Sequence, residues 1–195
     1  MKHSDWNFRR LSLAEQAALY QDHMKQDFPD SELKPLSMLE ELEERGINTI
    51  WGCFYQGALA GYYVLAREPG SKLILLDYLA VMPELRGNGC GSVIIKNLVE
   101  QLPEECYLFI ESENPKGASS PQDRRIRERR VAFYQRCGAI LSPLEVQLFG
   151  VDYAILTLSK GEPPSGKEQE RAYRALYRQM LTEERCQQKV HTLLL

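Results

Sequence analysis

Residues Leu73–Glu100 read LILLDYLAVMPELRGNGCGSVIIKNLVE, which predicts a strand, a glycine-rich turn and a helix in direct succession. The apolar run Leu73–Val81 is typical of a buried strand, and Met82-Pro83-Glu84-Leu85 ends it. Beyond the glycines, apolar residues recur at helical spacing, at Val93, Ile94, Leu98 and Val99. We therefore expect the fold to be built around this strand–turn–helix unit.

The turn itself, Arg86-Gly87-Asn88-Gly89-Cys90-Gly91-Ser92, has the composition of an anion-binding site. Backbone N–H groups in the first turn of a helix lack partners within the helix, and the helix dipole adds positive potential there. Glycines let the backbone approach a ligand closely and adopt positive φ. Arg86 adds a permanent cation. The sequence thus predicts a phosphate or pyrophosphate site, with an ordinary glycine-rich turn as the alternative.

Two common phosphate-binding patterns do not fit this turn. A Walker motif requires Gly-Lys-Ser/Thr, whereas the turn has Gly91-Ser92 without a lysine. A dinucleotide-binding turn needs its third glycine three residues after the second, whereas these glycines occupy positions 87, 89 and 91. Because neither pattern fits, we expect a phosphate ligand of another class than the ligands of these two motifs.

The segment resembles motif A of the GNAT superfamily of acetyl-CoA-dependent N-acetyltransferases, whose pattern is Arg/Gln-x-x-Gly-x-Gly/Ala. Arg86, Gly89 and Gly91 match it, as does the preceding Leu79-Ala80-Val81-x-Pro83. The resemblance implies that the coenzyme A pyrophosphate binds at Arg86–Ser92. It also implies that a bulge near Leu79, Ala80 and Val81 frees a backbone N–H to polarise the thioester carbonyl, while the Val81 backbone pairs with the pantetheine amides.

A second stretch, RVAFYQRCGA at positions 130–139, resembles motif B of the same superfamily. Phe133-Tyr134 and Gly138-Ala139 fit its pattern, and the implied role of Tyr134 is to protonate the departing thiolate. A core tyrosine on an amphipathic helix is the alternative. Many members place an asparagine seven or eight residues before this tyrosine, but Ile126 and Arg127 stand there, so the pantetheine contact is expected from elsewhere.

The remaining sequence predicts an α+β fold. The resembled superfamily implies a mixed sheet of about six to seven strands, with antiparallel N-terminal strands, one central parallel pair and flanking helices. Strands are expected at 6–11, 47–55, 59–66, 73–81, 107–111, 139–141, 146–149 and 153–158, and helices at 13–26, 36–45 and 124–136. The order strand, helix, strand from Leu73–Val81 to Tyr107–Glu111 indicates the parallel pair. Ligands bind outside the carboxyl ends of such strands.

The C-terminal part follows the linker Gly161-Glu162-Pro163-Pro164-Ser165-Gly166. We therefore expect a GNAT-like domain at 1–160 and, at 161–195, a linker with an amphipathic helix. One stripe of that helix is apolar, formed by Tyr173, Leu176, Tyr177, Met180 and Leu181. The stripe either docks on the domain or meets a partner, a homodimer being one such assembly.

Carboxylates near the carboxyl end of the second parallel strand are candidates for acid–base chemistry. Amine acetylation needs a neutral nucleophile, and a lysine-type amine has a pKa of roughly 10.4, so a base is required. Alternation puts Glu111 and Glu113 on one face of the strand. Glu111 is our first choice as base, followed by Glu113 and Asp77. These groups could equally bind a cationic acceptor or simply face water.

Composition excludes several classes of protein. The chain has 195 residues, a net charge of −3 and five scattered cysteines. These features argue against general nucleic-acid binding, a disulfide framework and a zinc site. The three histidines, His3, His23 and His191, are too scattered to predict a metal site. No apolar stretch approaches the length of a membrane span, so we expect a cytoplasmic protein without membrane, nucleic-acid or metal partners.

Three functions remain open. The first is an N-acetyltransferase that transfers an acetyl group from acetyl-CoA to a small-molecule or peptide primary amine by direct attack. The second is a non-catalytic acyl-CoA sensor or interaction module of GNAT-like fold that signals through its C-terminal helix. The third is a nucleotide-phosphate enzyme unrelated to GNAT, which the missing Walker lysine disfavours.

Overall fold

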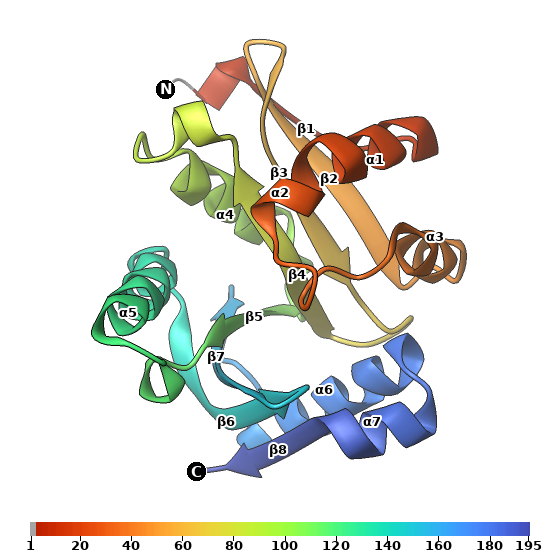
Figure 1. Ribbon diagram of the computed structural model, residues 1–195, viewed down its shortest axis with the longest axis vertical. Helices are drawn as coiled ribbons and strands as arrows, with labels where there is room; N and C mark the ends of the chain where they lie inside the picture. Colours follow the sequence, from red (N-terminus) through yellow and green to blue (C-terminus); the bar gives the residue numbers. More distant parts are fainter. Residues whose placement is uncertain (1–2) are drawn as a thin grey trace. The chain divides into compact units, whose positions relative to one another are not determined.

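The computed structural model describes residues 3–195, and within them eight strands form one sheet in the order β1-β2-β3-β4-β5-β7-β6-β8 (Figure 1). The strands are β1 Trp6–Arg10, β2 Asn48–Tyr55, β3 Ala58–Ala66, β4 Leu73–Val81, β5 Tyr107–Glu113, β6 Ile140–Leu148, β7 Val151–Ser159 and β8 Val190–Leu194. The helices are α1 Leu13–Leu19, α2 Lys25–Asp27, α3 Leu36–Glu44, α4 Cys90–Gln101, α5 Pro121–Arg136, α6 Gly166–Met180 and α7 Glu183–Lys189. A π-helical segment, η2 Tyr20–Met24, and three short 3₁₀ turns, η1 His3–Asp5, η3 Pro83–Leu85 and η4 Pro115–Gly117, complete them.

This architecture confirms the α+β class with antiparallel strands, one parallel pair and flanking helices. The expected strand count of six to seven was too low. The additional strand is β8, whose residues Val190–Leu194 pair antiparallel with β6. Its short apolar sequence carried no alternation that would distinguish an edge strand from a packed tail.

The chain forms two compact units. The first comprises the chain up to Ala66 together with Asp77–Ile94, and the second comprises Arg67–Leu76 with Ile95–Leu195. Strand β4 and helix α4 each contribute residues to both units. The C-terminal helix α6 belongs entirely to the second unit.

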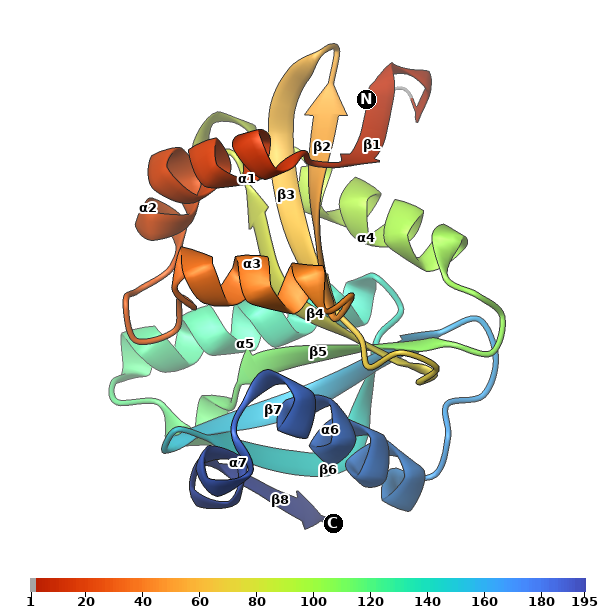
Figure 2. The same ribbon diagram turned by 90° about the vertical axis from the view of Figure 1, so that its right-hand side faces the viewer.

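In the first unit, β1, β2 and β3 form an antiparallel meander. Gln56 and Gly57 turn the chain between β2 and β3 at φ values of 50° and 84°, which is the hairpin predicted from Gln-Gly. Helices α1 and α3 lie on one face of these strands (Figure 2). Buried apolar side chains fill the space between, including Met24, Leu39, Ile50, Tyr62, Val64 and Tyr78.

The segment predicted as one helix from 13 to 26 is helical throughout but not uniform. Ser12 and Glu15 form the expected capping box, in which the Glu15 carboxylate accepts the Ser12 backbone N–H at 2.9 Å. The helix then widens into η2 before it ends as α2. A π-segment inserts extra backbone into a helix and often lies at a functional position. Here it carries the buried Tyr20, whose hydroxyl contacts the loop before α3.

In the second unit, residues Leu73–Leu76 of β4 pair in parallel with Tyr107–Ile110 of β5, which confirms the predicted parallel pair. Strands β7, β6 and β8 continue the order by antiparallel pairing. Helices α5 and α6 cover opposite sides of β5, β7 and β6 (Figures 1 and 2). The two runs expected at 139–141 and 146–149 are one strand, β6, interrupted by a register shift between Leu141 and Glu145.

Candidate active site

The glycine-rich turn of the first unit has the backbone of an anion site. Gly87 and Gly89 adopt φ values of 81° and 83°, where an L side chain is strained. A Cβ added at either position would meet nothing within 4 Å, so the backbone conformation rather than lack of space requires glycine. Among residues 3–195, no group accepts a hydrogen bond from the backbone N–H of Gly87, Gly89 or Gly91. These donors are thus available to an anion.

The turn leads into α4, whose first residue is Cys90. The Val93 N–H donates to the Gly89 carbonyl at 3.2 Å, which starts the helical hydrogen-bond series beside the exposed turn. Gly61 of β3 lets this helix approach the sheet closely. A Cβ there would lie 2.6 Å from the Ala80 carbonyl oxygen and 2.9 Å from Cδ1 of Ile94. The helix N-terminus is thereby fixed against β3 and β4.

The Arg86 side chain does not simply extend into this site as a free cation. Its Nε donates to the Val81 carbonyl at 2.9 Å and its Nη2 donates to Oδ1 of Asp27 at 2.7 Å. The Tyr62 hydroxyl donates to the other Asp27 oxygen at 2.8 Å. Arg86 therefore ties the turn to the end of β4 and to α2.

Asp77, a candidate substrate-binding carboxylate on β4, is paired with a lysine of the same unit. Nζ of Lys34 lies 2.7 Å from Oδ1 and 2.8 Å from Oδ2 of Asp77. The Asp77 side chain is 5% exposed and that of Lys34 is 18% exposed. The carboxylate thus holds a primary ammonium group in a nearly enclosed position.

In the second unit, Glu111 receives two phenolic hydrogen bonds from α6. The hydroxyls of Tyr173 and Tyr177 donate to its Oε1 at 2.6 Å and 2.7 Å. Tyr173 is fully buried, and burial followed by the nearby Glu111 charge raises its pKa well above the ordinary value. The Tyr173 phenol therefore remains a donor at neutral pH, and the two hydrogen bonds fix the orientation of the Glu111 carboxylate.

Glu113 is placed differently from Glu111, although alternation predicted a shared face. Its Oε1 lies 2.9 Å from Nη2 of Arg127, and its Oε2 lies 3.4 Å from Nη1 of Arg130, both on α5. Glu113 is the last residue of β5, so its side chain reaches the helix on the opposite side of the sheet from α6. Because two guanidinium groups already compensate its charge, Glu111 is the better candidate base.

Tyr134 lies in the last turn of α5 and is 8% exposed. Burial raises its pKa to about 12, partly opposed by the charge of Arg130. Its ring packs on Phe133 with a centroid separation of 5.0 Å. Among the described residues, its hydroxyl has no hydrogen-bond partner. The phenol is therefore protonated at neutral pH and able to donate.

The arginine-rich start of α5 is engaged within the unit. Arg127 bonds Asp123 at 3.0 Å and donates to the Asn114 carbonyl at 3.2 Å in addition to pairing with Glu113. Asn114 caps the short turn η4 by accepting the Lys116 N–H at 3.0 Å. Arg127, which stands where many members of the superfamily have asparagine, thus stabilises the loop after β5.

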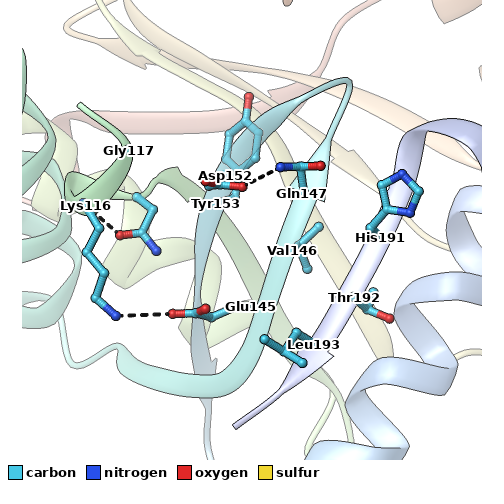
Figure 3. Close-up of a pocket in the computed structure, with 11 residues that line it drawn as sticks. Lys116, Gly117, Glu145, Val146, Gln147, Asp152, Tyr153, His191, Thr192 and Leu193 are labelled. Carbon is cyan, nitrogen blue, oxygen red and sulfur yellow. Dashed lines mark hydrogen bonds and ion pairs between the residues drawn. The ribbon is translucent and has the colours of Figure 1, made fainter. Parts of the chain in front are cut away.

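The second unit contains a cavity of about 370 Å³ (Figure 3). Its lining comes from β6, β7, β8 and the turn after β5. Two pairs of its polar side chains compensate each other: Lys116 faces Glu145 at 3.6 Å, and Gln147 donates to Asp152 at 2.8 Å. None of the ten predicted cofactor residues, Glu111 or Tyr134 lines it.

Sequence reasoning missed two contributions to these arrangements. Tyr173 and Tyr177 were predicted only as part of an apolar stripe, and nothing in the spacing of a helix indicates which carboxylate its tyrosines will meet. Lys34 lies in the break expected between the helices at 13–26 and 36–45, and no partner was predicted for its side chain. Its pairing with Asp77 joins residues 43 positions apart, a distance at which local patterns carry no information.

All five cysteines are free thiols. Within residues 3–195, no three His, Cys, Asp or Glu side chains gather as ligands of a metal would. No described helix has both the length and the apolar character needed to cross a bilayer.

Comparison with known proteins gives a family match. A sequence model of the acetyltransferase (GNAT) family matches residues 16–139. No curated protein matches the chain.

Solved structures share the fold. A protein of Bacteroides thetaiotaomicron described as a GNAT-family acetyltransferase aligns with a TM-score of 0.69 at 18% identity, covering 92% of this chain and 98% of that one. The ribosomal-protein-S18-alanine N-acetyltransferase of Escherichia coli aligns with a TM-score of 0.59 at 15% identity, covering 82% and 96%. A Bacillus subtilis acetyltransferase in complex with CoA gives 0.52 at 17% identity, covering 79% and 97%.

Proposed function

Because the chain belongs to the acetyltransferase (GNAT) family, and is therefore an acyltransferase, we propose that it transfers an acetyl group from acetyl-CoA to a primary amine by direct attack. The observation that carries this proposal is the turn before α4. Gly87, Gly89 and Gly91 present backbone N–H groups there, at the start of a helix, that find no acceptor among the described residues. This is the arrangement that a diphosphate requires.

The proposed cofactor site consists of Arg86, Gly87, Asn88, Gly89, Cys90, Gly91 and Ser92 for the diphosphate, with Leu79, Ala80 and Val81 along the pantetheine arm. Acetyl-CoA would supply the activated acyl group. The presence of CoA in the Bacillus subtilis structure of the same fold supports this choice of donor. Arg86 holds Val81 and Asp27 and so keeps the turn and the end of β4 in register.

The proposed chemistry divides between a base and an acid. Glu111 accepts a proton from the ammonium form of the acceptor, directly or through water, while hydrogen bonds from two phenols hold its carboxylate in one orientation. The neutral amine then attacks the thioester carbonyl, and a backbone N–H near Leu79–Val81 stabilises the oxyanion. Tyr134 donates a proton to the departing thiolate and is reprotonated by the proton that the nitrogen loses as the amide forms. A thiol with an unperturbed pKa of about 8.5 is a fair leaving group, so this last step needs only modest assistance.

The acceptor is proposed to be a small-molecule or peptide amine, and the site of action the cytoplasm. Asp77 and Glu113 were our further candidates for binding a cationic acceptor. Their charges are compensated by Lys34 and by Arg127 with Arg130, so an acceptor would have to compete with these partners.

Titration calorimetry with acetyl-CoA and a thiol-release assay over a panel of polyamines, amino acids and peptide amines test the proposal. We expect binding and acceptor-dependent release of CoA thiol. Gly89→Glu provides the matched control, because its bulk and charge should abolish binding. A folded protein that binds no acetyl-CoA would refute the proposal.

An acyl-CoA sensor is the second candidate function. The observation that favours it is the direct link between α6 and β5 through Tyr173, Tyr177 and Glu111. Such a link could carry a change at the strand to the C-terminal segment. Acetyl-CoA binding without turnover on any amine, together with a partner protein, or a second copy of this chain, that no longer binds after truncation at Lys160, would favour this function over catalysis.

A further inference from the structure

The primary ammonium group of Lys34 lies against β4, the strand that we propose to bind the thioester. Its Nζ is within hydrogen-bond distance of both carboxylate oxygens of Asp77, at 2.7 Å and 2.8 Å. It also lies 5.1 Å from the centroid of the Tyr78 ring, where a cation–π attraction adds to the ion pair. A carboxylate and an aromatic face are the groups that recognise an alkylammonium ion.

The backbone of Lys34 is held as firmly as its side chain. Its N–H donates to the Tyr78 hydroxyl at 2.9 Å, and its carbonyl accepts the Tyr20 hydroxyl at 3.1 Å. The Tyr78 hydroxyl in turn donates to the Glu32 carbonyl at 2.8 Å. The loop between α2 and α3 is therefore fixed to β4, and the amine is delivered to one place instead of sampling solvent.

The position of Asp77 relates this amine to the proposed cofactor segment. Side chains alternate along a strand, so Asp77 shares a face of β4 with Leu79 and Val81, whereas Tyr78 points to the opposite face. Lys34 contacts both the Tyr78 ring and the Asp77 carboxylate, so its side chain reaches round the edge of β4. The amine thus lies next to the segment along which the pantetheine arm is proposed to run.

We propose that Lys34 is itself an acetyl acceptor, so that the protein acetylates the Nζ of its own Lys34. This inference rests on the proposed function, because acetyl-CoA must supply the acyl group. Asp77 removes one proton from the ammonium, and the nitrogen lone pair attacks the thioester carbonyl carbon. The carbon–sulfur bond breaks and CoA leaves as the thiolate. The nitrogen loses its second proton, which the thiolate takes up, and an uncharged N-acetyl-lysine remains.

Proximity is the physical reason to expect this reaction. An amine held beside the thioester reacts at an effective concentration far above that of a free amine, provided that the geometry is close to that of attack. The Asp77 carboxylate supplies a base within hydrogen-bond distance of the nucleophile. The acetylated side chain can no longer pair with Asp77, which leaves this carboxylate to an external cation.

Non-enzymatic acetylation would show the opposite selectivity. Lys96 and Lys116 have side chains that are 76% and 79% exposed, with ion pairs at 3.9 Å and 3.6 Å, whereas the side chain of Lys34 is 18% exposed and paired at 2.7 Å. Simple reaction with acetyl-CoA in solution therefore modifies Lys96 and Lys116 first. Preferential modification of Lys34 requires a bound and oriented donor.

The test incubates the full-length protein with acetyl-CoA and no added amine, and follows each lysine by peptide mass spectrometry over time. We expect Lys34 to be acetylated at least about tenfold faster than Lys96 and Lys116. The rate per protein molecule should not change on dilution, since donor and acceptor lie in one chain. A rate that falls in proportion to protein concentration would show transfer between copies and would overturn the inference.

Two variants separate catalysis from background. Gly89→Glu should abolish Lys34 acetylation while leaving the slow modification of Lys96 and Lys116 unchanged. Asp77→Asn should slow the reaction at Lys34, with circular dichroism confirming that the variant is folded.

If the protein binds acetyl-CoA and acetylates added amines but Lys34 reacts no faster than Lys96, this inference fails and the proposed function stands. If no acetyl-CoA binds, both fail.

Discussion

The hydroxyl of Tyr173 donates a 2.6 Å hydrogen bond to Oε1 of Glu111, joining a helix of the C-terminal segment to the central strand β5. Tyr177, one helical turn later, donates to the same oxygen at 2.7 Å. The GNAT family match ends at residue 139, so both donors come from outside the matched segment. If Glu111 is the base, its orientation depends on residues that the family match does not include.

Tyr173→Phe removes one donor with little change in shape. We expect kcat to fall by about tenfold while the affinity for acetyl-CoA is retained. The acid limb of the pH–rate profile should move to higher pH, because the ionised carboxylate loses a hydrogen bond. Initial-rate kinetics between about pH 5 and pH 9 measure the fall in kcat and the shift of the acid limb.

Tyr107→Phe is the matched control for Tyr173→Phe. Tyr107 is a buried tyrosine of the same unit, on β5, and its hydroxyl makes no hydrogen bond to any described residue. Its replacement should leave the pH profile in place. An unchanged profile in Tyr173→Phe, or an equal shift in both variants, would show that the Tyr173 hydroxyl does not position a catalytic carboxylate.

Tyr134→Phe should slow turnover, by about tenfold or more, and leave cofactor binding nearly intact. Burial raises the Tyr134 pKa to about 12. The phenol therefore stays protonated as pH rises through the neutral and mildly alkaline range, and the rate should not decline there through loss of this acid. Single-turnover kinetics with calorimetry separate the two effects. Equal losses of binding and turnover would indicate a structural tyrosine.

The parts of the fold that could be predicted are those fixed by local patterns. The bounds of β4 matched the apolar run Leu73–Val81, and the turn required glycine where φ is positive, at Gly87 and Gly89. Strand β8 and the π-segment η2 were not predicted. Strand β8 pairs at the edge of the sheet with β6, which lies about 45 residues earlier in the sequence. Such non-local pairing cannot be predicted from local sequence patterns.

The candidate site also has a part that the sequence predicted and a part that it did not. Motif residues such as Gly89 and Tyr134 could be named from the sequence because their spacing is local. The partners that set their chemical environment could not. Arg86 meets Asp27 across 59 positions, and Tyr177 meets Glu111 across 66. Such pairs are chosen by tertiary packing, so the sequence indicated the ionisable groups but not whether each was compensated.

Glu15→Gln tests a pH-dependent contribution to stability. The Arg9 guanidinium, followed by the Ser12 backbone N–H and hydroxyl, lowers the Glu15 pKa from 4.5 to about 2. A carboxylate whose pKa is lower in the folded state stabilises the protein above its unfolded pKa, and this contribution is lost as pH falls toward the folded value. Wild type should therefore exceed Glu15→Gln in free energy of unfolding at pH 7, and the difference should shrink as pH falls from 4.5 toward about 2.

Urea unfolding of both proteins at several pH values measures this difference. Glu41→Gln serves as control, since Glu41 makes an exposed ion pair with Arg45 at 3.3 Å. Such a pair contributes at most about 0.5 kcal/mol to the free energy of unfolding. A gap between wild type and Glu15→Gln that stays constant through the acid range would contradict the role assigned to the Arg9–Glu15–Ser12 group.

Gly89→Ala separates backbone strain from ligand binding. Gly89 has a φ of 83° with no atom near an added Cβ, and Gly46 has a φ of 70° with equally open surroundings. Alanine at either position should destabilise the fold by about 1–2 kcal/mol, because an L residue is strained in this conformation. Only Gly89→Ala should weaken acetyl-CoA binding, since only that turn presents the N–H groups proposed to hold the diphosphate. Thermal unfolding and calorimetry on the pair decide the matter: equal affinity in the two variants would mean that the turn before α4 does not contact the cofactor.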